Sequence, residues 1–276
     1  MKIGEAIERI EAYHAPVEAG RQLVDGLKTG DPDAELTGIA TTCSASVDVI
    51  RKAAAAGLNF IVCHEPVFYT TLDNDTSWLE GKNEVFEKKR ELCRQYGIAI
   101  YRDHDRIHND GKAPGRVDGI YYGVMCELGW DKYLIGEPVR PMIFDLPETT
   151  VRELALFLKE KIHTNGVRVI GDPDAKVSKA ALYTHVEAFT GDIASTEFLN
   201  RDDVDVMIPL ELIDWSVSSY ARDAEQLGLN KAILNLGHFN TEELGMKYAV
   251  RWISEIMDHE VPVEFIASAD IAHYII

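Results

Sequence analysis

Three histidines follow, directly or nearly so, apolar stretches that are predicted to be strands: His64 after 58–63, His104 after 98–101 and His238 after 231–236. In open α/β sheets, ligands bind in the crevice beyond the carboxyl ends of the strands. A histidine at each of three such ends favours a shared role over coincidence. Their positions therefore predict a common binding site at one edge of the sheet.

Further imidazole and carboxylate groups accompany these histidines. The candidate metal ligands are His64, Glu65, His104, His108, His238 and Glu242. Imidazoles and carboxylates without thiolates favour a divalent first-row metal, and we expect zinc, iron or manganese. Six ligands exceed what one tetrahedral ion takes and are closer to what two ions need. If Glu242 lies on the first turn of a helix, the helix dipole favours its ionised form.

Each residue alone also has an ordinary interpretation. A single histidine after a strand is more often a hydrogen-bonded loop residue than a ligand, and the stretch Asp103–Asp110 is compatible with a solvated turn. The repeated strand-end position is what favours a metal site. Three second-half residues could also face it: His185, Glu187 and Glu211. We expect surface or capping roles for His14, His163, His259 and His273.

The composition excludes several classes of function. With 28 basic and 46 acidic residues the net charge is −18, which argues against binding to nucleic acid or to anionic membranes. Four cysteines without a C-x-x-C pair indicate a reducing compartment. The longest uncharged apolar stretch, 53–63, is far shorter than the ~20 residues of a membrane span. The N-terminal residues do not resemble a signal peptide, so we expect a soluble cytoplasmic protein.

The elements that must position these residues alternate along the chain. Short β-branched runs and longer runs of helical period predict an α/β protein of two domains with mostly parallel or mixed sheets. Predicted strands are 36–42, 58–63, 98–101, 142–146, 167–170, 179–183, 204–209, 231–236 and 261–266. The first predicted helix runs to Ala56 after a cap at Ser44 or Ser46, and the next is 83–96, ended by Gly97. Further predicted helices are 117–128, 151–163 with a cap at Thr149 or Thr150, 216–227, and 242–259 with a capping box of Asn240 and Glu243. Breaking residues from Gly129 to Pro141 place the domain boundary between 1–135 and 136–276.

Three motifs in the same order resemble those of the Nif-three-like dinuclear-metal-centre family, also labelled the GTP cyclohydrolase I type 2 family. The stretch from Ile61 to Phe68, with His64-Glu65-Pro66, resembles its strand and His-His-Pro signature. Residues 237–242 resemble its Gly-His-aromatic-x-x-Glu motif, and 104–108 occupy the place of its His-Thr-x-x-Asp. Here Glu65 replaces the second histidine and His108 replaces the aspartate. Both replacements are competent ligands and leave the formal ligand charge unchanged.

The resemblance implies that two metal ions are bound by His64, Glu65, His108, His238 and Glu242, with Glu242 as a bridging carboxylate. His104 would be a further ligand or an acid/base group. The resemblance also implies two α/β domains, a dimetal site in the cleft between them, and a homohexamer.

The function expected first is a metal-dependent hydrolase that acts on a nucleotide-like or phosphorylated small molecule through a metal-activated water. His104 and Glu242 would be its catalytic residues, and Arg102 and Arg106 could bind a phosphate or carboxylate. The alternative is a non-enzymatic protein of metal insertion, buffering or regulatory interaction, because no nucleophile–base pair or phosphate-binding glycine loop is evident. A TIM-barrel hydrolase is less favoured, since too few strand–helix units are present.

Overall fold

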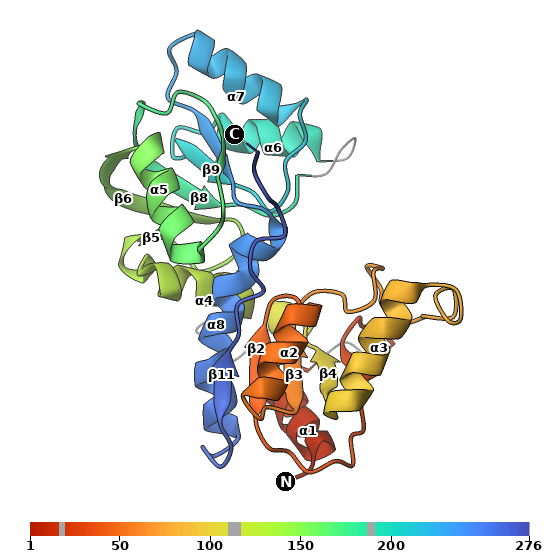
Figure 1. Cartoon of the computed structure of the whole chain (residues 1–276). Coiled ribbons are helices and arrows are strands. Elements are labelled where there is room, and N and C mark those ends of the chain that lie inside the picture. Colours follow the sequence, from red (N-terminus) through yellow and green to blue (C-terminus); the bar gives the residue numbers. More distant parts are fainter. Residues whose placement is uncertain (17–19, 110–116, 187–190, 276) are drawn as a thin grey trace. The chain divides into compact units, whose positions relative to one another are not determined.

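The computed structural model describes residues 1–16, 20–109, 117–186 and 191–275. The chain forms two compact units. Unit 1 consists of Met1–Gly123 and Glu243–Ser268, and unit 2 of Val124–Glu242 and Ala269–Ile276. Each unit has its own sheet with helices packed on it, which confirms the predicted mixed α/β class (Figure 1).

The sheet of unit 1 has five strands in the order β1-β4-β3-β2-β11. Their bounds are β1 Gly26–Thr29, β2 Ile39–Thr42, β3 Phe60–Cys63, β4 Ala99–Arg102 and β11 Val263–Phe265. The strands β4, β3, β2 and β11 are parallel, and β1 is an antiparallel edge strand. The carboxyl ends of β3 and β4 therefore lie at the same edge, where His64 and His104 follow.

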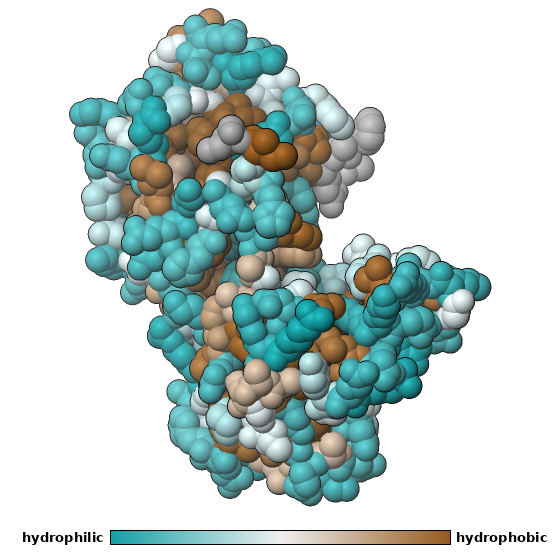
Figure 2. Space-filling view, in the orientation of Figure 1, coloured by the Kyte–Doolittle hydropathy of each residue, from teal (hydrophilic) through white to brown (hydrophobic). Residues whose placement is uncertain are grey.

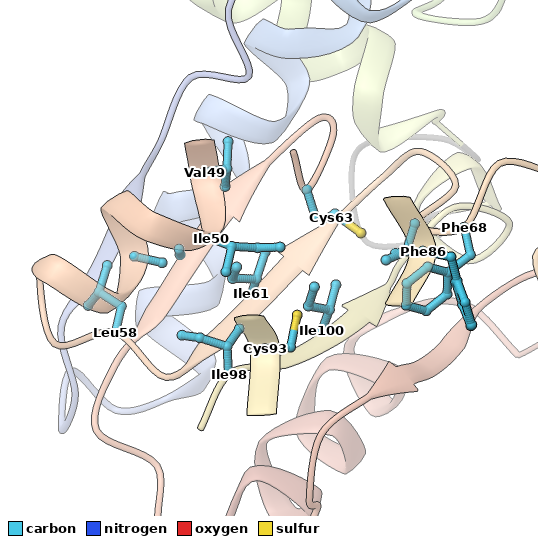
Figure 3. Close-up of a cluster of buried hydrophobic side chains, with 14 of the residues drawn as sticks. Val49, Ile50, Leu58, Ile61, Cys63, Phe68, Phe86, Cys93, Ile98 and Ile100 are labelled. Carbon is cyan, nitrogen blue, oxygen red and sulfur yellow. The ribbon is translucent and has the colours of Figure 1, made fainter. Parts of the chain in front are cut away.

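Two helices cover one face of this sheet. They are α2 (Val47–Ala55), capped by Ser46, and α3 (Glu84–Tyr96), which begins after the cap Asn83 and ends at the left-handed Gly97. Their apolar side chains pack on Ile61, Cys63 and Ile100 of the central strands (Figure 3). Cys63 is fully buried in this core.

The helices α1 (Ile3–Tyr13) and α8 (His238–Ile256) also contribute to unit 1. Tyr13 stacks on Trp252 of α8 with ring centroids 4.3 Å apart. The hydroxyl of Tyr101 in β4 donates a hydrogen bond to Glu11 of α1. Because Tyr101 alternates with the core residue Ile100 along β4, α1 packs on the side of the sheet opposite to α2 and α3.

Unit 2 has a six-stranded sheet in the order β5-β6-β8-β9-β10-β7. Its strands are β5 Leu134–Ile135, β6 Met142–Thr150, β7 Arg168–Ile170, β8 Lys176–Leu182, β9 Val206–Ile208 and β10 Ala232–Asn235. The strands β8, β9 and β10 are parallel neighbours, whereas β5, β6 and β7 pair antiparallel. His185, Glu211 and His238 come after these three parallel strands.

The helices wholly within unit 2 are α5 (Val151–Ile162), α6 (Asp192–Leu199) and α7 (Val217–Gln226). Of the two predicted caps, Thr149 and Thr150, it is Thr150 that caps α5, and it forms a capping box with Glu153. Residues of α6 and α7 share one apolar cluster with the strand residues Met207 and Ile233. Short elements complete the described chain: η1 (Ile107–Asn109), α4 (Gly119–Leu128) and η2 (Asp131–Tyr133).

The residues that form the two observed units differ from the predicted ranges 1–135 and 136–276. Residues 243–268 belong to unit 1, because β11 pairs in parallel with β2 of the first sheet. The start of the last helix was also predicted wrongly. The helix begins at His238, and the Asn240 amide donates to the Leu236 carbonyl and does not cap the helix. The predicted capping box is therefore absent.

The visible surface is predominantly hydrophilic, in keeping with the excess of acidic residues (Figure 2). In the part of the chain that the structure describes, no helix is long and apolar enough to cross a membrane.

Candidate metal-binding groups

Unit 1 brings together His64, His104 and His108. Each offers one ring nitrogen within 4.8 Å of the others, a separation that a shared cation can span after small ring rotations. The rings of His64 and His104 are stacked with centroids 4.6 Å apart, and His108 meets both edge-on at 4.7 and 4.8 Å. The first two follow β3 and β4, and His108 lies in η1 one helical turn after His104. We call these residues the three-histidine group.

In the three-histidine group, Nδ1 of each imidazole is hydrogen-bonded to an oxygen atom. Nδ1 of His64 donates to the Asp103 carbonyl at 3.0 Å. Nδ1 of His104 donates to Asp105 at 3.0 Å, and Nδ1 of His108 donates to Asp118 at 2.6 Å. A proton on Nδ1 makes Nε2 the nitrogen with the lone pair. The same arrangement orients histidines that ligate metals, so this donor set fits a divalent cation.

The backbone around His104 is held by Asp25, just before β1. The Asp25 carboxylate accepts hydrogen bonds from the backbone N–H groups of His104, Asp105 and Arg106, at 3.3, 2.9 and 3.1 Å. Asp105 in turn accepts the Val24 N–H at 3.0 Å. Residues 24–25 thus position both the backbone and the ring of His104, a role that the sequence analysis did not anticipate.

Asp118 links His108 to the following helix. One carboxylate oxygen accepts the His108 hydrogen bond, and the other accepts the Tyr121 N–H at 3.0 Å. Asp118 directly precedes α4 and is buried, so it acts as the helix cap. The position of His108 is therefore coupled to the start of α4.

Arg102 supports His64. Its Nε donates to the His64 carbonyl at 3.0 Å, and its Nη1 donates to the Thr71 carbonyl at 2.7 Å. The residue is only 1% exposed, so it does not face solvent as an anion-binding arginine would. The expectation that Arg102 binds a phosphate or carboxylate is thus not met; it holds the loop that follows β3.

The electrostatics favour a neutral imidazole at His104. Burial, together with the neighbouring His64 and His108, lowers the pKa of His104 to about 3. A neutral ring can bind a cation, but with this pKa it has no acidic proton to deliver at neutral pH and is a weak proton acceptor. In the metal-free protein, His104 is therefore suited to ligation more than to general-acid catalysis.

Unit 2 contains a second group, formed by His185, Glu211 and His238, whose potential ligand atoms also lie within 4.8 Å of one another. The His185 Nδ1 lies 2.8 and 3.0 Å from the two Glu211 oxygens, and the His238 Nδ1 lies 2.7 Å from one of them. On the other side of the His238 ring, Nε2 is 3.2 Å from Glu242, four residues further along α8. His238 thus lies between two carboxylates.

Glu211 is anionic in this environment. Burial raises its pKa, but the hydrogen bonds from His185 and His238 outweigh burial and bring the pKa down to about 2. The same contact has the opposite effect on the imidazole, because the hydrogen bond to Glu211 raises the pKa of His185. The carboxylate therefore keeps a full negative charge between two imidazoles.

The six predicted ligands are distributed over the two units. His64, His104 and His108 meet in unit 1, and His238 contacts Glu242 in unit 2. Glu65 is buried beside His64 but is not a member of the three-histidine group. His185 and Glu211, named only as residues that could face the site, have a strand-end position like that of His64. Glu187 lies outside the described residues.

One histidine expected at the surface is buried. His14 ends α1, and its Nε2 lies 2.9 Å from the Asp103 carboxylate, with both side chains inaccessible to solvent. Asp103 also offers its backbone carbonyl to His64. The pair of His14 and Asp103 therefore holds the backbone directly before His104, at the carbonyl that accepts the His64 hydrogen bond.

The structure thus has two α/β units, each with imidazole and carboxylate groups at strand ends that could hold a divalent cation. The chain belongs to the Duf34/NIF3 (NGG1p interacting factor 3) family, whose sequence profile matches residues 1–271. This confirms the resemblance drawn from the three motifs.

Curated relatives are similar over most of their length. A "GTP cyclohydrolase 1 type 2 homolog" of Clostridium acetobutylicum is 26% identical over 88% of this chain and 85% of its own. One of Clostridium perfringens is 25% identical over 98% of this chain and 97% of its own.

Solved structures show the same fold. The Staphylococcus aureus protein SA1388 aligns with a TM-score of 0.68 at 17% identity, over 100% of this chain and 99% of its own. A Bacillus cereus protein related to NIF3 aligns equally well, also at 17% identity, over 100% of this chain and 99% of its own. HcgD from Methanocaldococcus jannaschii has a TM-score of 0.64 at 20% identity, over 96% of this chain and 97% of its own.

Proposed function

We propose that this protein binds two divalent cations and uses them to hydrolyse a nucleotide-like or phosphorylated small molecule. The observation that carries the proposal is the three-histidine group, in which three imidazoles share one locality and each has Nδ1 hydrogen-bonded to an oxygen. Neutral imidazoles in this arrangement are suited to zinc, iron or manganese.

The first ion would be held by His64, His104 and His108, with Glu65 as the neighbouring carboxylate. The second would be held in unit 2 at His238, beside which Glu242 is the carboxylate predicted from the sequence. Divalent cations lower the pKa of bound water toward neutrality and polarise a phosphoryl or carbonyl oxygen. The names of the curated relatives support a nucleotide-like substrate.

The residues of the chain would have separate tasks in the reaction. Asp105 and Asp118 hold His104 and His108 in place through Nδ1, and Arg102 fixes the backbone at His64. Glu242, in contact with Nε2 of His238, is the candidate to accept a proton or orient that ring. A cytoplasmic location and assembly into a homohexamer remain part of this proposal.

The test is an assay of the full chain against nucleoside phosphates and phosphomonoesters, with phosphate release and base absorbance as readouts. We expect turnover with added Zn²⁺, Fe²⁺ or Mn²⁺ that is lost in His104→Asn. The matched control is His259→Asn, an exposed histidine whose positive φ asparagine tolerates.

Metal binding without turnover of any substrate would favour the alternative of a metal-insertion or regulatory protein. A metal that leaves with weak chelators would support that alternative further. A chain that binds none of the three metals would contradict the proposal as a whole.

A further inference from the structure

The group in unit 2 stands at the carboxyl ends of three adjacent parallel strands. His185 follows β8, Glu211 follows β9, and His238 follows β10 as the first residue of α8. This edge of a parallel sheet is where ligands bind in open α/β folds. The three side chains converge because neighbouring strands of one sheet supply them, and all three belong to unit 2.

The distances within this group are slightly shorter than those between ligands of one ion. The Glu211 carboxylate lies 2.8 Å from the Nδ1 of His185 and 2.7 Å from that of His238. Two ligands at bond lengths of about 2.1 Å are separated by about 3.0 Å in octahedral and about 3.4 Å in tetrahedral geometry. Small outward movements would therefore admit a cation between the three donors.

The chemistry of the donors also suits a cation. Two imidazoles and one anionic carboxylate are a set that binds zinc and iron in proteins. The side chains are partly exposed, at 47% for His185, 42% for Glu211 and 27% for His238. Solvent can therefore complete the coordination of an ion bound there.

We propose that His185 and His238 through Nδ1, together with Glu211, bind one divalent cation. The inference rests on the proposed function, which puts an ion at His238, and adds two ligands to it. When Nδ1 of His238 ligates, the ring carries its proton on Nε2, which donates a hydrogen bond to the Glu242 carboxylate 3.2 Å away. Glu242 then orients the ring, and Glu211 binds the ion.

The experiment is titration of the metal-free full chain with Co²⁺, whose visible spectrum reports ligation by imidazole and carboxylate. Variants are Glu211→Gln, His185→Asn, His238→Asn and Glu242→Gln. Glutamine at 211 keeps a carbonyl that accepts hydrogen bonds but loses the charge that a ligand needs. Matched controls in unit 2 are the exposed Glu225→Gln and His163→Asn. Circular dichroism and the thermal midpoint verify folding.

We expect Glu211→Gln, His185→Asn and His238→Asn each to lower the affinity for one Co²⁺ by more than about 100-fold. Glu242→Gln should lower this affinity by about 10-fold, as loss of an orienting group does. If Glu211→Gln and His185→Asn keep the ion while Glu242→Gln and His238→Asn lose it, the inference is overturned and the proposed function stands. If His238→Asn also keeps every ion, both the inference and the second ion of the proposed function are wrong.

Discussion

His104 is buried beside two other imidazoles, and both burial and these neighbours lower its pKa. Its pKa in the folded protein is about 3, whereas the ordinary value is 6.5. Below pH 6.5 the unfolded chain binds a proton that the folded chain excludes. The free energy of unfolding of the metal-free protein therefore contains a contribution from His104 that is present above pH 6.5 and is lost as the pH falls towards 3.

We predict that His104→Asn removes this contribution. As the pH is lowered from 6.5 towards 3, the free energy of unfolding of the wild type should fall relative to that of the variant by up to about 1.4 kcal/mol per pH unit. Urea unfolding of both proteins in a chelator, at several pH values, measures the difference, in which the other titrating groups largely cancel. Parallel curves for the two proteins would show that His104 titrates normally.

Asp118 offers a second prediction, because it both caps α4 and orients His108. Asp118→Ala should lower the affinity for Zn²⁺ by about 10- to 100-fold, as loss of a carboxylate behind a ligating histidine does. It should also cost about 1 kcal/mol of stability through the lost cap. Isothermal titration and thermal unfolding measure the two effects.

Ser46→Ala is the control for Asp118→Ala. The Ser46 side chain caps α2 by accepting a hydrogen bond from the Val49 N–H. The substitution removes this cap without altering the three-histidine group. The stability cost should be similar, with unchanged Zn²⁺ affinity. Equal losses of affinity in both variants would mean that helix capping, not orientation of His108, explains the effect.

Between elements, α4 and α8 approach closely within unit 1 at two glycines. A Cβ on Gly245 would lie 2.7 Å from the Ile120 carbonyl oxygen, and one on Gly123 would lie 2.9 Å from the Gly245 Cα. These positions require glycine because of backbone contact. The approach packs the part of α8 that belongs to unit 1 against the start of α4.

Gly245→Ala tests this packing. Alanine in a helix interior normally stabilises by up to about 1 kcal/mol relative to glycine. Here the clash with backbone atoms should reverse the sign and cost about 1–3 kcal/mol. Chemical denaturation measures the change in the free energy of unfolding. A gain in stability would show that the two helices separate easily.

Elements with strong local signals were predictable from the sequence. The uninterrupted apolar run at β3, Ser46 as one of the two predicted caps of α2, and Gly97 after α3 all correspond to the observed elements. Asn83, predicted as the first helical residue, is the cap of α3. The strand β1 was missed because Lys28 and Thr29 give it no apolar pattern. The helix α6 was missed because its apolar residues stand at its two ends without a clear helical period. Tertiary contacts decided the start of α8, since Asn240 bonds to Leu236 and Thr164.

The candidate site was predictable in part for the same reason. Strand-end position identified His64, His104 and His238, and it also applies to His185 and Glu211. Sequence could not show that one carboxylate bonds both unit 2 imidazoles, because strand order decides which ends are neighbours. Asp25 carried no signal, since its role is to bind backbone N–H groups far along the chain.

For the whole molecule, the path of the chain differs from a simple division into halves. The C-terminal strand β11 returns to pair with β2, so the first sheet is complete only when residues 263–265 are present. Pairing between such distant segments is not encoded in local periodicity. Among the described residues, the three-histidine group lies in unit 1, and the group of His185, Glu211 and His238 lies in unit 2.

The central claim is that these groups bind divalent cations, and elemental analysis of the full chain purified without added metal tests it most directly. We predict about two zinc, iron or manganese ions per chain in the wild type. A double variant, His104→Asn with His108→Asn, should retain about one, since the group in unit 2 is unaltered. Wild-type protein that contains no such metal and takes none up, or a double variant that binds as much as the wild type, would contradict the account.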